Sequence, residues 1–112
     1  MQHVRSAIVI IGGLLVAAAV FGSAWAEASF ERGQEKAATC VACHGVDGLS
    51  PNPMFPNLAG QNAAYLEIQL TNFKTGERYH PLMSPIAESL SNEDIESLAI
   101  YYNRITITGN RQ

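Results

Sequence analysis

Two cysteines and a histidine stand together in the segment Cys40-Val41-Ala42-Cys43-His44. Residues three apart lie on the same face of a helical turn, so both thiols can reach one edge of a porphyrin and form thioethers with its two vinyl groups. The histidine that follows lies under the ring, where a neutral imidazole nitrogen can ligate iron. This C-x-x-C-H spacing predicts a c-type haem attached through Cys40 and Cys43, with His44 as an iron ligand.

Other chemistries of a cysteine pair fit this segment less well. A disulfide between Cys40 and Cys43 is the default in an oxidising compartment, but the histidine that follows directly favours haem. A thioredoxin-like redox pair is expected in a βαβ context, and no strand pattern flanks this one. A zinc site needs four ligands, and only His80 could be the fourth beside the two thiols and the adjacent imidazole.

A haem iron with both axial positions filled needs a second protein ligand. A methionine thioether or a second histidine could supply it, so the candidates in the sequence are Met54, Met83 and His80. Chain reach does not decide between them, because ten extended residues span about 33 Å. Ligation by two histidines would lower the reduction potential relative to a histidine and a methionine.

The first of three expected helices runs over about 29–40 and leads directly into the cysteine motif. Ser29 can cap its N-terminus. Gly33 lies one turn after Phe30 and weakens the helix. Either another helix crosses closely at this glycine, or the glycine has no particular role.

Proline and glycine punctuate residues 45–61, which are therefore expected to form a loop. A second helix is expected over about 62–75, with apolar residues at Leu66, Leu70 and Phe73. Gly76 should end this helix, because glycine readily adopts the left-handed conformation of a C-cap. Residues 77–83 are expected to form another loop.

The third main helix is expected to begin after Ser91 and to fray near Arg104. Ser91 and Asp94 form a variant of the capping box that marks a helix N-terminus. Pro85 suits the first turn of a short helix upstream. The expected apolar stripe of the third helix comprises Ile95, Leu98, Ala99 and Tyr102.

Composition limits the remaining possibilities. The chain has 112 residues, 15% of them charged, with a formal net charge of −3. A charge-rich disordered chain and a basic nucleic-acid binder are therefore excluded. A domain of this size has difficulty building a sufficient core unaided and often needs a disulfide, a metal or a partner. A covalently attached haem would fill that need.

Residues 1–26 have the order of a secretory signal peptide. Arg5 provides the positive n-region, an apolar run follows, and Ala24-Trp25-Ala26 is a cleavage pattern. Cleavage after Ala26 would leave a domain over 27–112 with a net charge of −4, of which 105–112 is expected to be a flexible tail. The alternative is an uncleaved membrane anchor formed by residues 6–26.

The sequence resembles the class I c-type cytochromes, and most closely their bacterial cytochrome c4-like subgroup. The resemblance covers nearly all of residues 29–104. It continues through Leu90-Ser91 and Asp94-Ile95 to Ala99 and Tyr101-Tyr102. Its most specific stretches are Cys40 to Gly45 (CVACHG), Phe55 to Gln61 (FPNLAGQ) with Tyr65 following, and Met83 to Ala87 (MSPIA). The subgroup often carries two such domains in tandem, and this chain has one haem motif.

The resemblance implies a compact all-α class I cytochrome c fold, with three main helices wrapped around one covalently attached haem. In this family a methionine is the second iron ligand, and the match places it at Met83. The family's loop proline, here Pro56, offers its carbonyl to the other nitrogen of the ligating histidine. Leu58 is expected to pack on the haem. Met54 then lies on the histidine side, as a gap-filling thioether.

The function implied is that of a periplasmic one-electron carrier whose iron cycles between Fe(II) and Fe(III). Its expected partners are redox proteins of the respiratory chain, such as membrane-bound reductases or terminal oxidases, with no nucleic acid and no small-molecule substrate. One alternative is an electron-transfer subunit of a larger membrane or dehydrogenase complex. Another is a haem enzyme or gas sensor with five-coordinate iron, against which the methionine loop argues.

Overall fold

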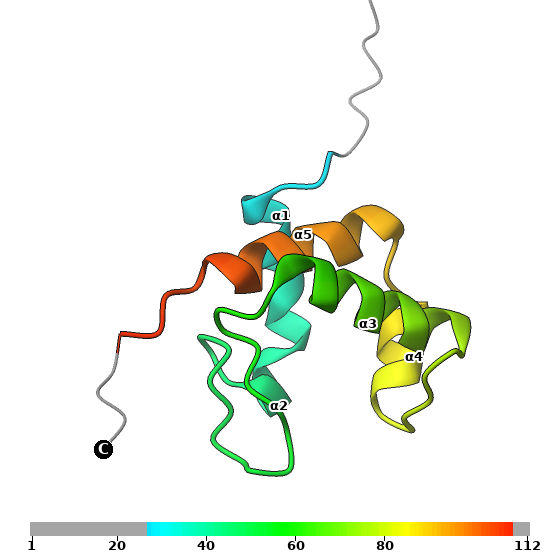
Figure 1. Cartoon of the computed structure of the whole chain (residues 1–112), viewed down its shortest axis with the longest axis horizontal. Helices are drawn as coiled ribbons and strands as arrows, with labels where there is room; N and C mark the ends of the chain where they lie inside the picture. Colours follow the sequence, from blue (N-terminus) through cyan, green and yellow to red (C-terminus); the bar gives the residue numbers. More distant parts are fainter. Residues whose placement is uncertain (1–26, 109–112) are drawn as a thin grey trace, which may run out of the picture.

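The computed structural model describes residues 27–108, and all regular structure within that range is helical. The predictions of a signal peptide or anchor within residues 1–26 lie outside the described residues, as do residues 109–112 of the predicted tail over 105–112. No helix within 27–108 is long and apolar enough to cross a bilayer. The elements are α1 (Phe30–Lys36), η1 (Ala37–Thr39), α2 (Val41–His44), α3 (Ala63–Thr75), α4 (Met83–Glu88) and α5 (Asn92–Arg104) (Figure 1).

Helix α1 crosses closely over α5 at Gly33. A Cβ atom at Gly33 would lie 2.1 Å from the carbonyl oxygen of Ser97, so only glycine lets the two backbones approach this closely. The Ser97 hydroxyl accepts a hydrogen bond from the Ser29 amide at 3.1 Å. The rings of Phe30 and Tyr101 pack beside the crossing, with centroids 5.3 Å apart. The interpretation of this glycine as a helix-crossing site is confirmed.

The predicted helix caps are present. The Ser29 side chain accepts from the Arg32 amide, and Gly76 ends α3 in the left-handed conformation, with φ of 84°. Ser91 and Asp94 form a complete capping box at the start of α5. These local signals place the helices because the end of a helix must satisfy backbone groups that have no partner within it.

The first expected helix is wrong in one respect, since it is not continuous from 29 to 40. The α-helix ends at Lys36, and the chain tightens into the 3-10 turn η1, where the Cys40 amide donates to the Ala37 carbonyl at 2.8 Å. The Thr39 hydroxyl also donates to the Lys36 carbonyl, which competes with α-helical pairing. The cysteine motif therefore lies on its own short helix, α2. Met83 likewise begins α4 instead of ending a loop.

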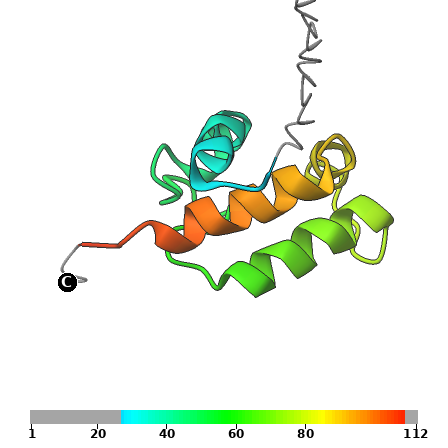
Figure 2. The ribbon, with the colours of Figure 1, turned by 90° about the horizontal axis from the view of Figure 1, so that it is seen from above.

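The buried core lies between α5 and the helices on either side of it. Seen from above, α3 runs alongside α5, and α1 lies on the other side of α5 (Figure 2). The predicted stripe on α5 is confirmed, because all four of its residues are buried. The connected core comprises Ala37, Leu66, Leu90, Ile95, Leu98, Ala99 and Tyr102.

Asp94 joins α1 to α5 and should make the stability of the protein sensitive to acid. Burial alone would raise the pKa of this carboxyl, but hydrogen bonds from the Ser91 amide and Arg32, with the charges of Arg32 and Lys36, lower it below its ordinary value. Its distances to Arg32 and Lys36 are 2.8 and 3.4 Å.

A group with a lowered native pKa contributes stability above its unfolded pKa and loses it as the pH falls through the native pKa. We therefore expect Asp94→Asn to reduce the free energy of unfolding at pH 7 by about 0.5–2 kcal/mol, the range for a lost capping interaction. The difference from the native protein should shrink below pH 4. Thermal unfolding followed by circular dichroism across pH 2–8 measures both effects, and Glu96→Gln on the exposed side of α5 is the control. A pH-independent difference would contradict the assignment.

Candidate functional site

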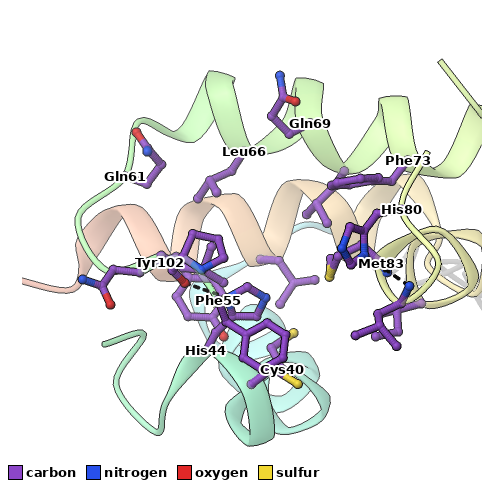
Figure 3. A pocket seen from close by; sticks show the side chains of 18 of the residues that line it. Cys40, His44, Phe55, Gln61, Leu66, Gln69, Phe73, His80, Met83 and Tyr102 are labelled. Atoms are coloured by element: carbon purple, nitrogen blue, oxygen red, sulfur yellow. Dashed lines mark hydrogen bonds between the residues drawn. The ribbon is translucent and has the colours of Figure 1, made fainter. Parts of the chain in front are cut away.

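A cavity of ≈ 440 Å³ opens between the cysteine turn, the 45–61 loop, α3, α4 and α5. Figure 3 shows it from close by, with His44 and Met83 on opposite sides. Its volume is in the range of small-molecule and cofactor sites. Most of the residues around it are apolar or aromatic: Phe55, Pro56, Leu58, Leu66, Leu70, Phe73, Leu82, Ile86, Leu90, Leu98 and Tyr102.

Both cysteines line this cavity from the turn that α2 makes. Cys40 is the N-cap of α2, and its carbonyl accepts from the amides of Cys43 and His44 at 3.3 and 2.9 Å. The two thiols are free and half-buried. Burial raises the pKa of the Cys40 thiol above its ordinary value, although neighbouring hydroxyls oppose the shift. The two thiols therefore share a cavity wall, as attachment of one flat group requires.

The imidazole of His44 is held in one orientation. Its Nδ1 lies 2.8 Å from the carbonyl oxygen of Pro56, which can only accept, so the proton is on Nδ1 and the lone pair of Nε2 is free. His44 is 7% exposed. A histidine fixed in this way by a backbone carbonyl has the usual geometry of a metal ligand.

The loop that presents Pro56 is fastened by side chains. The Ser50 hydroxyl donates to the Cys43 carbonyl at 2.9 Å, and the Ser50 amide donates to Asn57 Oδ1 at 2.7 Å. These bonds close the proline-rich loop onto the cysteine turn. Leu58 follows on the same loop, half-buried against the core and facing the cavity.

The three candidates for the second ligand differ in their environments. Met83 is the first residue of α4, is half-buried and lines the cavity. Met54 is 81% exposed and lies two residues before Pro56, on the loop that binds the histidine. His80 is exposed, and its Nδ1 lies 3.2 and 3.4 Å from the amides of Leu82 and Met83.

The contacts of His80 bear on its ability to ligate a metal. Amides donate, so Nδ1 of His80 must accept, and the neutral ring then carries its proton on Nε2. The amide of His80 also donates to the Ser84 hydroxyl at 3.0 Å. His80 therefore contacts the start of α4 with both its backbone and its ring, and it also lines the cavity.

The other readings of the cysteine pair find no support in residues 27–108. The thiols are not joined to each other. No three histidine, cysteine, aspartate or glutamate side chains in this range are grouped to hold a metal ion. The expected strand context of a thioredoxin-like pair is also missing from the described part of the chain.

Two further polar groups lie around the cavity, and Arg78 is among the residues that the sequence offers as possible contacts of haem or its propionates. Arg78 stacks on Phe73, 4.4 Å from the ring centroid, and its guanidinium donates to Gln69 at 2.6 Å. The Tyr102 hydroxyl is buried without a hydrogen-bond partner. Its place in the apolar stripe predicted that the ring is buried but not which neighbour its hydroxyl meets.

This set of groups fits a haem with covalent attachment. Two thiols on one wall, an imidazole with a free Nε2, a thioether facing it and an apolar lining are what the group requires. The family model for cytochrome c matches residues 30–103 of the chain. The chain belongs to the cytochrome c family. It is therefore a c-type cytochrome, an electron-transfer protein whose haem c is attached through Cys40 and Cys43.

Individual cytochromes support the same assignment. The chain is 47% identical over 74 residues to cytochrome c-554(548) of Halomonas halodenitrificans, covering 63% of this chain and 89% of that protein. It is 41% identical over 93 residues to cytochrome c4 of Pseudomonas aeruginosa, covering 83% of this chain and 46% of the relative.

The fold comparison agrees. The crystal structure of reduced recombinant cytochrome c4 from Pseudomonas stutzeri superposes with a TM-score of 0.66 at 41% identity, over 70% of this chain and 46% of that one. The predicted all-α class I cytochrome c fold is thus confirmed. The chain spans about half the length of the cytochrome c4 proteins it matches and nearly all of the Halomonas cytochrome.

Proposed function

We propose that this cytochrome carries single electrons between redox proteins in the periplasm, with His44 and Met83 as the axial ligands of its haem iron. The observation that carries the proposal is their placement on opposite sides of one cavity, with Nε2 of His44 free and His80 engaged at the start of α4. The haem supplies an iron that exchanges one electron between Fe(II) and Fe(III).

The residues around the cavity would assist this electron exchange by holding the same positions in both oxidation states of the iron. The Pro56 carbonyl fixes the plane and tautomer of the His44 ring, and α4 fixes Met83. Leu58 and the other apolar residues exclude water from the cavity, and a thioether ligand raises the reduction potential. With both axial positions occupied, no substrate or gas reaches the iron without displacing a side chain.

A reduced-minus-oxidised spectrum combined with a potentiometric titration tests this function. We expect a haem c spectrum and one reversible one-electron transition. Rapid binding of carbon monoxide by the reduced protein would instead support a haem enzyme or gas sensor with an open iron position.

The location is proposed from the N-terminal segment. Residues 1–26 would direct export and be removed after Ala26, leaving the cytochrome domain over 27–112 in the periplasm. Mass spectrometry of the purified protein tests this, because recovery of Arg5 would contradict cleavage. Retention in the membrane fraction together with that residue would favour the alternative of an anchor over residues 6–26.

The proposed partners are redox proteins of the respiratory chain, including membrane-bound reductases and terminal oxidases. A relative from Thiomonas intermedia, 39% identical over 85 residues, is named a thiosulfate dehydrogenase electron acceptor. That name supports the second candidate, in which this cytochrome accepts electrons as the subunit or direct partner of a dehydrogenase. Co-purification of the native protein with a dehydrogenase distinguishes the two.

The acidic charge of the chain should make its reaction with a basic partner depend on salt. Charge steering accelerates association by about 10-fold or more at low ionic strength and is screened by salt. We therefore expect the second-order rate of electron transfer to a basic partner protein to fall about 10-fold between 10 mM and 500 mM salt in stopped-flow measurements. An uncharged chemical reductant is the control and should show little change. A rate that does not depend on salt would contradict steering by the net charge of −4 that the domain over 27–112 carries.

A further inference from the structure

The Tyr102 side chain is buried in a way that calls for a partner. The residue is 3% exposed, and its hydroxyl makes no hydrogen bond within the described protein. A buried phenol normally finds a hydrogen-bond partner, because water no longer supplies one. This unpaired hydroxyl therefore suggests that its hydrogen-bond acceptor forms only when the cofactor is attached.

The position of this hydroxyl is set by the backbone around the ring. A Cβ atom at Gly48 would lie 3.0 Å from the Tyr102 ring, so the loop backbone packs directly against its edge. The carbonyl of Tyr102 accepts from the Gly60 amide at 2.8 Å. The ring of Tyr101 packs edge-on against it, with centroids 5.0 Å apart. The ring is thus contacted from two sides, and its backbone is fixed by a hydrogen bond, so the ring has little freedom to turn its hydroxyl elsewhere.

Cys40 is the cavity residue whose sulfur can serve as this acceptor. Tyr102 and Cys40 both line the cavity and are drawn together in Figure 3. Burial, followed by the neighbouring Cys40, raises the pKa of the Tyr102 hydroxyl, so it keeps its proton and remains a donor at every physiological pH. A sulfur atom is a weak acceptor, and it loses its own donor hydrogen when it becomes a thioether.

We propose that the Tyr102 hydroxyl donates a hydrogen bond to the Cys40 sulfur once haem is attached, and that it thereby raises the reduction potential of this cytochrome. The positive end of the O–H dipole would then face the haem edge and favour the electron-rich Fe(II) state. Tyr102 is a positioning and tuning residue, not a ligand. The inference rests on the proposed electron-carrier function.

The test compares Tyr102→Phe with Tyr101→Phe, since both lose one hydroxyl from adjacent residues of α5. Tyr101 packs on Phe30 and does not line the cavity, so it is a matched control. We expect Tyr102→Phe to weaken the equilibrium for reduction about 3- to 10-fold, where 10-fold corresponds to 59 mV. Its thermal midpoint should fall, because a hydrogen bond is lost. Tyr101→Phe should change the equilibrium less than about 2-fold.

If the hydroxyl has no hydrogen-bond partner in the haem-bearing protein, Tyr102→Phe should give the opposite result. The reduction potential would then stay unchanged, and the thermal midpoint would rise because a buried unpaired hydroxyl costs stability. That outcome would overturn the proposal. Should Tyr102→Phe fail to mature, the native reduced protein decides by proton NMR. A slowly exchanging Tyr102 hydroxyl proton supports the bond, and its absence contradicts it. A native protein without a reversible one-electron couple would contradict the electron-carrier function itself.

Discussion

Replacing Met83 by alanine is expected to remove the methionine–ferric charge-transfer band and to open the iron to carbon monoxide. Met83 is the half-buried thioether that faces the cavity opposite His44, whereas His80 serves the start of α4 through its Nδ1. Loss of a thioether ligand also removes an interaction that favours Fe(II), so the reduction potential should fall. Visible absorption and a potentiometric titration measure all three effects.

The chain offers a matched control in Met54. This methionine also lines the cavity but is 81% exposed and lies on the histidine-binding loop. Met54→Ala should therefore keep the charge-transfer band, the potential and the resistance to carbon monoxide. A band that survives in Met83→Ala but disappears in Met54→Ala would contradict the proposed ligand and reverse the assignment. Absence of the band from the unmodified protein, together with opening of the iron to carbon monoxide in His80→Ala, would favour ligation by two histidines.

Without haem, residues 27–112 are expected to be largely unfolded. The ≈ 440 Å³ cavity would then be a void bordered by apolar side chains of the core. Much smaller core cavities left by leucine-to-alanine substitutions cost about 3–5 kcal/mol. An unfilled site of this size therefore removes a large part of the stability of a typical domain, about 5–15 kcal/mol. A chain that cannot fill the cavity should therefore lose its tertiary structure.

Far-ultraviolet circular dichroism of a Cys40→Ser, Cys43→Ser double variant measures this effect. We expect the double variant to show little helix and no cooperative thermal transition. The native protein with its attached haem should unfold cooperatively. Conversion of Ala42, an exposed residue between the two cysteines, to serine is the control and should leave attachment and folding intact. A haem-free chain with native helix content and a cooperative transition would contradict the role of haem as core.

The sequence predicted the helix ends because they depend on local chemistry. Ser29 and Ser91 each accept a hydrogen bond from a backbone amide three residues further on. Gly76 ends α3 by adopting the left-handed conformation. The sequence predicted a helix crossing at Gly33 as only one of two interpretations of this glycine. The partner Ser97 is 64 positions away, and no local pattern identifies it.

Features that depend on competing local bonds or on distant neighbours were not predicted. The break after Lys36 arises from a threonine hydroxyl bond that periodicity does not detect. The engagement of His80 with the amides of α4 depends on how the preceding loop turns. The proposed partner of the Tyr102 hydroxyl, Cys40, is 62 positions away in the sequence. The cysteine–histidine motif thus predicted the identity of the site, whereas tertiary packing determines which side chains surround it.

The crossing of α1 over α5 also sets an order of assembly. The segment that bears both thiols is synthesised before α5, the helix against which α1 must pack. Until that helix emerges, the Gly33 surface has nothing to dock on, since such long-range contacts form late. The thiols should accordingly remain accessible on an open chain for the whole interval in which attachment occurs. Closing the domain is then the last step of maturation, and it seals the cofactor beneath a helix that arrives after it.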